Sequence, residues 1–206
     1  MNYMMLNGKK IELTAEQAEE IKRSFEKTQI KLADIEAGKT FKVGDYEFIV
    51  LEQSENAAAV ILKALYRNSE FFGENNNYDG SNVDAICKDF GCEIEKIIGE
   101  ENLIKHTVNL TADDGLKCYG SIERKMSLLT ANLYRKYVDL LDEYKIDDWW
   151  WTATAYSTPK HDNSSWVKCV SPRGGIHNSD SYDIISGVRP FCILNSNIFV
   201  SKVEEK

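Results

Sequence analysis

The feature that most constrains the fold of this chain is a tryptophan-rich region that runs from residue 147 to residue 199. All four tryptophans of the sequence lie in it: Trp149, Trp150, Trp151 and Trp166. Tryptophan has a large apolar surface and an indole N–H that requires a hydrogen-bond acceptor. Their concentration in one region therefore predicts a packed centre with polar groups at its margin.

Apolar segments of the same region predict three neighbouring antiparallel strands, at residues 149–154, 166–170 and 188–194. Successive side chains of a strand point to opposite faces, so at least one of the three consecutive tryptophans should point away from the core. We expect its ring to mark a helix-covered face or a binding surface. In this arrangement Trp150 and Trp166 are structural residues.

The length of 206 residues, with 43% of them hydrophobic, allows one well-buried core and an appended element. We interpret the chain as an N-terminal extension, residues 1–37, followed by one α+β domain, residues 38–206. The formal charge of -8 argues against direct nucleic-acid binding, because that affinity comes mostly from lysine and arginine. An acidic protein can mimic nucleic acid or bind a basic partner, or its charge can simply keep it soluble.

The start of the sequence lacks the basic residues, apolar run and cleavage site of a signal peptide. No apolar run approaches the roughly 18 residues of a membrane span. The five cysteines are odd in number and include no CxxC pair, so neither a disulfide framework nor a zinc site is indicated. These features predict a protein of a reducing cytoplasm without membrane contact.

The N-terminal extension should contain a helix. Thr14 and Gln17 have the spacing of a capping box, in which the side chain of each residue accepts a hydrogen bond from the backbone N–H of the other. Ala18, Ile21 and Phe25 then form a narrow apolar stripe. Such a stripe predicts a helix that lies on the domain; the alternative is a helix for a partner or for a homodimer.

The domain should begin with a β-hairpin, in which residues 40–43 and 46–51 flank the turn pair Gly44 and Asp45. Residues 57–66 are then expected to form the third strand of a meander. The elements predicted after it are a loop at 68–80, a helix from Ser81 to Phe90 ended by Gly91, a helical turn to Ile98, strands at 103–110 and 126–130, and a sheet-covering helix at 131–144.

The order of these elements, the aromatic triplet 149–151 and the ending Gly187-Val188-Arg189-Pro190 together resemble the DUF6273 domain family. The resemblance covers roughly residues 38–201. That family is similar to C-type-lectin-like folds, which include formylglycine-generating-enzyme-like domains and retroelement variable proteins. The resemblance implies a mixed or antiparallel sheet with two or three covering helices. It also implies a protein of phage or mobile-element origin, located in the host cytoplasm or in the virion.

The sequence departs from this pattern in places. Family members commonly follow the aromatic pair with a Leu-Arg-Ser type of sequence, whereas this chain continues with Trp151-Thr152-Ala153-Thr154-Ala155. The oxygen-ligand motifs of calcium-dependent sugar-binding lectins are absent from the sequence, which gives a calcium-bridged sugar site no support. The paired redox cysteines of formylglycine-generating enzymes have no evident counterpart either.

The binding surface is expected in the polar segments 158–165 and 174–182, since loops on a rigid scaffold commonly carry recognition. The predicted contact residues are Trp149, Trp151, Arg173, His177, Asn178, Asp180 and Tyr182. The alternative is that these segments are connections without a ligand. Arg189 should hold a carboxylate or carbonyl groups where the chain enters its last strand, and Pro190 should fix the backbone there.

No motif indicates catalysis. His106, His161 and His177 lie far apart in the sequence, outside any metal-binding pattern, and the paired aspartates are typical of solvated loops. We therefore predict no catalytic residue, no cofactor and no metal ion.

Three hypotheses for function follow. The first is a non-enzymatic module that binds a protein, or a glycan, through its C-terminal loops. The second is an intracellular inhibitor of a bacterial defence nuclease, similar to an anti-CRISPR protein, which binds through its acidic surface. The third is an enzyme of the formylglycine-generating or metal-dependent type.

Overall fold

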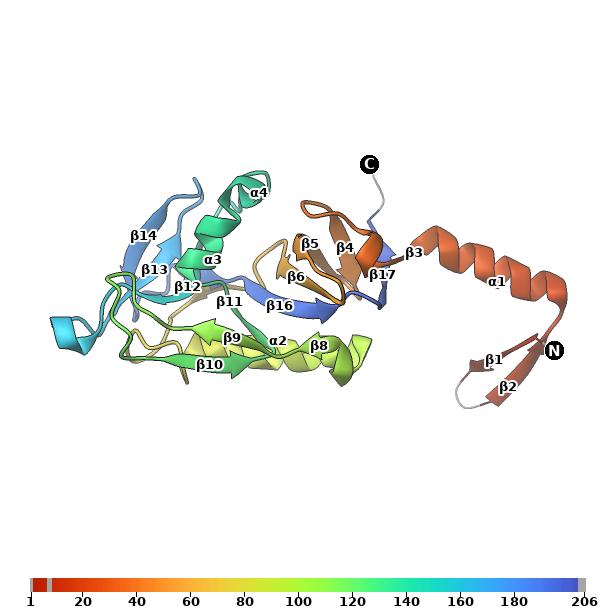
Figure 1. The fold of residues 1–206 in the computed structure, drawn as a ribbon, viewed down its shortest axis with the longest axis horizontal. Helices are drawn as coiled ribbons and strands as arrows, with labels where there is room; N and C mark the ends of the chain where they lie inside the picture. The colour runs from red at the N-terminus through yellow and green to blue at the C-terminus, as the bar shows by residue number, and fades with distance from the viewer. Residues whose placement is uncertain (1, 7–8, 204–206) are drawn as a thin grey trace.

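The computed structural model of the chain describes residues 2–6 and 9–203. Its first elements are strands β1 (Asn2–Leu6) and β2 (Lys9–Leu13), which form a hairpin, and helix α1 (Ala15–Thr28). Figure 1 shows α1 projecting from the domain, with the hairpin at its far end.

The predicted capping box of α1 is confirmed. The Gln17 N–H donates to Thr14 Oγ1 at 3.1 Å, and the Thr14 N–H donates to Gln17 Oε1 at 3.0 Å. The expectation that α1 lies on the domain is wrong, since the helix stands away from it and Ile21 is 46% exposed. The Phe25 side chain lies outside the described part of the chain, and a partner or dimerisation role for α1 stays a prediction.

The larger sheet has the strand order β11-β16-β6-β5-β4-β17-β3, and β8 also pairs with β16. Its strands are β3 (Gln29–Lys31), β4 (Thr40–Val43), β5 (Tyr46–Gln53), β6 (Ala57–Leu62), β8 (Leu103–Ile104), β11 (Met126–Leu128), β16 (Pro190–Asn195) and β17 (Phe199–Lys202). The β4–β5 hairpin and the third strand of the meander are confirmed, and Gly44 has the positive φ of 58° that its turn requires. Strand β3 comes from the predicted extension, and Leu32 directly after it is fully buried in the core.

The smaller sheet has the order β14-β13-β12-β15-β7. Its strands are β7 (Arg67–Glu70), β12 (Trp149–Ala155), β13 (Trp166–Val170), β14 (Ile176–Asp180) and β15 (Ser186–Val188). The antiparallel pairing of β12 with β13 confirms two of the three strands predicted around the tryptophans. A short hairpin of β9 (His106–Asn109) and β10 (Ser121–Arg124) lies beside the two sheets.

The prediction of one antiparallel strand over residues 188–194 is wrong, because the chain changes sheets at Arg189. Before that residue, β15 runs parallel to β12; after it, β16 pairs with β6 and β11 in the larger sheet. Arg189 is 1% exposed and donates from Nε to the Leu62 carbonyl at 2.9 Å and from Nη2 to the Lys63 and Tyr144 carbonyls. These bonds hold the crossing point, and Pro190 opens the new strand.

The helices of the domain are α2 (Asn82–Ile98), α3 (Ala131–Lys136) and α4 (Val138–Asp142), with short 3-10 turns at Leu32–Asp34, Glu100–Asn102 and Pro159–His161. Ser81 caps α2 as predicted, by accepting the Asp84 N–H at 3.2 Å. Helix α2 does not end at Gly91, where a Cβ atom would lie 3.1 Å from Met126 Cβ. Glycine there allows close packing against β11, and the helix continues to Ile98 with Gly99 as its C-cap.

Two further predicted elements are each divided in two. The strand expected at 103–110 is interrupted at Lys105, between β8 and β9, and the helix expected at 131–144 breaks at Tyr137, between α3 and α4. With these corrections the fold is α+β, with mostly antiparallel sheets and few helices. None of its described helices is long and apolar enough to cross a membrane.

Adjacent tryptophans of β12 face two different cores, as the alternation of a strand requires. Trp151 lies in the core that includes α2, next to Phe72 at 5.6 Å between ring centroids. Trp150 lies on the opposite face, which α3 and α4 cover, with its ring edge-on to Tyr134 at 5.5 Å. Figure 1 shows α2 and the α3–α4 pair on opposite sides of the strands. The helix-covered face expected for one tryptophan is therefore present, although the Trp150 ring is buried.

Candidate functional site

Most of the predicted contact residues lie on or next to one edge strand of the smaller sheet. Residues 174–182 were expected to form a loop, but Ile176–Asp180 is strand β14, which among the described residues pairs with β13 alone and so has one free side. His177 and Asn178 are exposed on this strand, and Arg173 is exposed in the turn before it. We call this strand with its free side the β14 edge.

The backbone pattern of the β13–β14 hairpin determines which groups face the free side. The Ser171 N–H donates to the Gly175 carbonyl at 2.9 Å, and the Ser181 N–H donates to the Ser165 carbonyl at 2.7 Å. In an antiparallel pair such bonded positions alternate with positions whose backbone groups point outward. The bonded positions of β14 are therefore the odd-numbered ones, and the N–H and C=O groups of Ile176 and Asn178 point away from β13.

One end of the β14 edge is covered by a side chain. Asp183 Oδ2 accepts the Asp180 N–H at 3.2 Å and the Ser179 hydroxyl at 2.8 Å. The Asp183 carboxylate therefore accepts the one N–H of Asp180 that points away from β13. The outward N–H and C=O groups of Ile176 and Asn178 remain for a partner. The end of the strand near Asp180 and Asp183 is acidic, whereas the turn at the other end carries Arg173.

An exposed apolar surface adjoins the acidic end. Phe71 is 38% exposed, Tyr182 62%, Ile184 64% and Ile185 52%. We call these four residues the loop patch. The Phe72 N–H donates to the Ser181 carbonyl at 2.8 Å, and the Tyr182 hydroxyl donates to the Glu74 carbonyl at 2.5 Å, so the two loops are tied together. Sequence reasoning missed the two isoleucines, although their position beside aspartates in a polar segment was a signal.

The four tryptophans differ in their access to this surface. Trp149 is half-buried and meets the His177 ring edge-on at 5.1 Å, which joins it to the β14 edge. Trp151 is fully buried, so the prediction that it contacts a partner does not hold for this structure. Trp166, expected to be structural, is 46% exposed and lies 5.7 Å from the Tyr156 ring.

Asn76, which sequence reasoning also missed, positions the neighbouring loops. Its side chain is fully buried and donates to the Ser157 carbonyl at 3.1 Å and to the Trp166 carbonyl at 3.0 Å. Its Oδ1 accepts the Tyr119 hydroxyl at 2.6 Å. One amide therefore connects three segments that lie far apart in the sequence.

The histidines form no recognisable catalytic arrangement. His161 Nδ1 and the Ser157 hydroxyl both contact Asp114 Oδ2, whereas a serine triad requires the histidine between the serine and the carboxylate. His106 is 9% exposed, and burial lowers its pKa to about 4. Among the side chains that the structure describes, no three histidine, cysteine or acidic groups lie close enough together to hold a metal ion.

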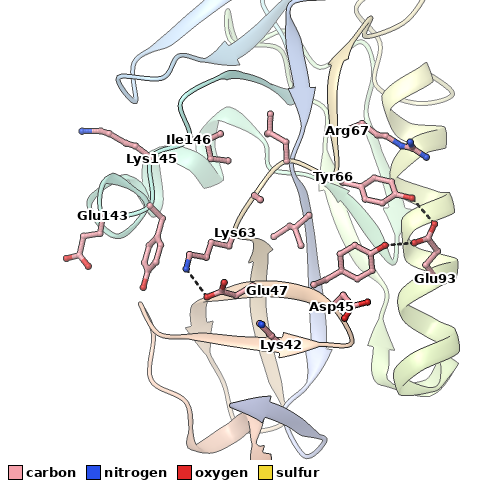
Figure 2. Close-up of a pocket in the computed structure, with 15 residues that line it drawn as sticks. Lys42, Asp45, Glu47, Lys63, Tyr66, Arg67, Glu93, Glu143, Lys145 and Ile146 are labelled. Atoms are coloured by element: carbon pink, nitrogen blue, oxygen red, sulfur yellow. Dashed lines mark hydrogen bonds and ion pairs between the residues drawn. The ribbon is translucent and has the colours of Figure 1, made fainter. Parts of the chain in front are cut away.

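A separate groove of about 970 Å³ is lined in part by residues 62–67 of the β6–β7 connection. It is bordered by the β4–β5 hairpin, α2 and the segment that follows α4. Figure 2 shows Glu93 of α2 beside Tyr66 at one end, the Lys63–Glu47 pair near the middle, and Glu143 and Lys145 at the other end. The Tyr46 hydroxyl also bonds Glu93. No residue of this groove was predicted as a contact residue.

Comparison of the chain with protein-family models, with curated proteins and with solved structures found no match in any of the three.

Proposed function

We propose that the protein is a non-enzymatic binding module that recognises an extended segment of a partner protein along the β14 edge. The observation that carries this proposal is the pair of outward-facing backbone positions, Ile176 and Asn178, beside the exposed loop patch. An extended peptide can add to such an edge as a further strand. Its backbone hydrogen bonds then provide affinity, and its side-chain contacts provide specificity. We further propose a C-type-lectin-like domain of phage or mobile-element origin, on the sequence resemblance described above.

The charges along the edge indicate which segment would fit. Arg173 lies at one end, and Asp180 and Asp183 lie at the other. A partner strand with an acidic residue near Arg173 and a basic residue near the two aspartates would complement both ends. The loop patch then offers an apolar contact beyond the acidic end.

The test is a substitution that removes one outward backbone donor. Asn178→Pro eliminates an N–H that β13 does not use, so the strand should persist, since proline is tolerated where the amide faces solvent. Asn178→Ala is the matched control, because it changes the side chain and keeps the N–H. The probes are linear peptides selected on the wild-type protein from a random displayed library.

We expect the selected peptides to bind Asn178→Ala as they bind wild type, and to bind Asn178→Pro at least about tenfold more weakly, the equivalent of one or two lost hydrogen bonds. Melting temperatures of both variants report whether the fold is kept. Equal binding to the two variants, or a glycan array that gives ligands where the peptide library gives none, would contradict the proposal.

A second candidate is the inhibitor of a bacterial defence nuclease, and the projection of α1 favours it. Glu16, Glu19 and Glu20 are exposed on a helix that stands away from the domain, where it could reach a basic groove. Reversal of these three charges to lysine should abolish protection of a phage in a host that carries the nuclease, and binding should weaken steeply with salt. Retained protection would count against this candidate.

A further inference from the structure

The groove in Figure 2 contains a carboxylate that is held in place by two phenols. The Tyr66 hydroxyl donates to Glu93 Oε1 at 2.7 Å, and the Tyr46 hydroxyl donates to Glu93 Oε2 at 2.8 Å. These hydrogen bonds, that of Tyr66 above all, keep the pKa of the Glu93 carboxyl below its ordinary value. Glu93 is therefore ionised at neutral pH, and each of its oxygens keeps a lone pair for a further donor.

No ion pair neutralises this carboxylate within the described chain. The ion pairs of the groove and of α2 involve other acidic residues: Glu47 with Lys63, Asp84 with Lys88 and Arg124, and Glu95 with Lys125. Glu93 is a rigid, partly exposed anion at the wall of the groove. Arg67 and Lys96 lie near enough to help keep the pKa of Glu93 low, but neither forms an ion pair with it in the described chain, so a cationic ligand could still gain a charge-assisted hydrogen bond at its oxygens.

The rings around Glu93 also suit a cation. Phe90 is fully buried and backs both tyrosines, with ring centroids 4.4 Å from Tyr66 and 4.8 Å from Tyr46. The Arg67 guanidinium already lies over the Tyr66 ring, 5.1 Å from its centroid. Aromatic faces attract cations at such distances, and guanidinium groups stack on them readily.

The rest of the groove carries charges of both signs, and these charges limit which kind of ligand can lie along it. Lys63 bonds Glu47 at 2.8 Å and lies 5.9 Å from the Tyr144 ring centroid. Beyond it Figure 2 shows Lys145 and Glu143 at the far end. A volume of about 970 Å³ is at the upper end for small-molecule sites and admits a short peptide. Mixed charges along the walls suit a polar chain better than an apolar one.

We propose that this groove is a second binding site, independent of the β14 edge, which takes the guanidinium group of an arginine-bearing peptide segment at the Glu93 carboxylate, beside the hydroxyl groups of Tyr46 and Tyr66. The cation bonds the two carboxylate oxygens on the sides that the phenols leave open. The peptide backbone then follows the β6–β7 connection toward Lys63 and Tyr144.

The experiment uses the full chain and a defined probe. Acetyl-Gly-Arg-Gly amide is titrated into isotopically labelled protein and followed by amide chemical shifts, beside the same peptide with citrulline, which has the arginine shape without the charge. Glu93→Gln removes the charge and keeps an acceptor for the phenols. Asp89→Asn, an exposed position on the same helix, is the matched control for the change in net charge.

For wild type and Asp89→Asn we expect shifts centred on Tyr46, Tyr66 and Glu93, with an affinity at least about tenfold higher than for Glu93→Gln or for the citrulline peptide. Tyr66→Phe keeps the ring and should lose less affinity than Glu93→Gln. Equal binding of the arginine and citrulline peptides, equal weakening in Asp89→Asn, or no shifts in the groove would each overturn the proposal. If Glu93→Gln fails to fold, the citrulline comparison on wild type decides alone.

Discussion

Replacement of Trp151 by alanine should lower the free energy of unfolding by about 3–5 kcal/mol, the usual cost of truncating a large buried aromatic side chain. The Trp151 ring is fully buried and packs edge-on against Phe72, and its indole N–H donates to the Glu70 carbonyl at 2.7 Å. The substitution leaves a cavity and removes the N–H that bonds the Glu70 carbonyl. The loss of this hydrogen bond contributes about 1–3 kcal/mol of the total cost. For a domain with a stability of about 5–15 kcal/mol, this loss is large enough to reduce the yield of folded protein.

The matched comparison is Trp166→Ala, since both tryptophans belong to the same sheet and Trp166 is 46% exposed. Its substitution should cost no more than about 1 kcal/mol, as for most surface positions. Urea denaturation of both variants, followed by circular dichroism, gives the two free energies on one scale. Similar costs for the two substitutions, or a cost below about 1 kcal/mol for Trp151→Ala, would refute the assignment of the core.

Three further predictions concern residues that the fold uses. Burial lowers the pKa of His106 to about 4 in the folded protein, so the unfolded chain binds more protons between pH 6.5 and about pH 4. The free energy of unfolding from urea denaturation should therefore decrease as the pH is lowered through this window, by up to about 3 kcal/mol more in wild type than in His106→Gln. Gly187→Ala should cost at least about 2 kcal/mol in the same assay, because its Cβ would lie 2.4 Å from Leu65 Cδ1 and 2.7 Å from the Arg67 carbonyl oxygen. Asn76→Ala should accelerate amide hydrogen exchange around Tyr119 while exchange in α2 stays unchanged.

The parts of the fold that depend on neighbouring residues could be predicted from the sequence. The β4–β5 hairpin follows from Gly44 in its turn, and the start of α2 follows from the Ser81 cap. Both signals act over a few residues, so tertiary context had little opportunity to change them. The alternation of Trp150 and Trp151 was predictable for the same reason.

Long-range packing decided the elements that the sequence did not predict correctly. The change of sheets at Arg189 depends on carbonyls of Leu62, Lys63 and Tyr144, which no local pattern identifies. Gly91 has the appearance of a helix terminator, and only the approach of Met126 explains it inside α2.

The candidate site was predicted in part. His177 and Asn178 lie together on one edge strand, but the polar composition of this segment indicated a loop. An exposed edge strand need not alternate apolar and polar residues, so the sequence pattern of a strand was missing. The groove at Glu93 could not be predicted, since it brings together residues from four separate segments.

Strand β16 has a consequence for how the protein is made. It lies between β6 and β11 in the larger sheet, yet the ribosome synthesises it after both of them. The β4, β5 and β6 meander can assemble early because each strand pairs with its sequence neighbour, and β6 then presents an unpaired apolar border until β16 emerges. A nascent chain in this state is open to mispairing with other chains. We therefore expect translation speed and chaperone supply, rather than final stability, to limit the amount of protein that a cell accumulates.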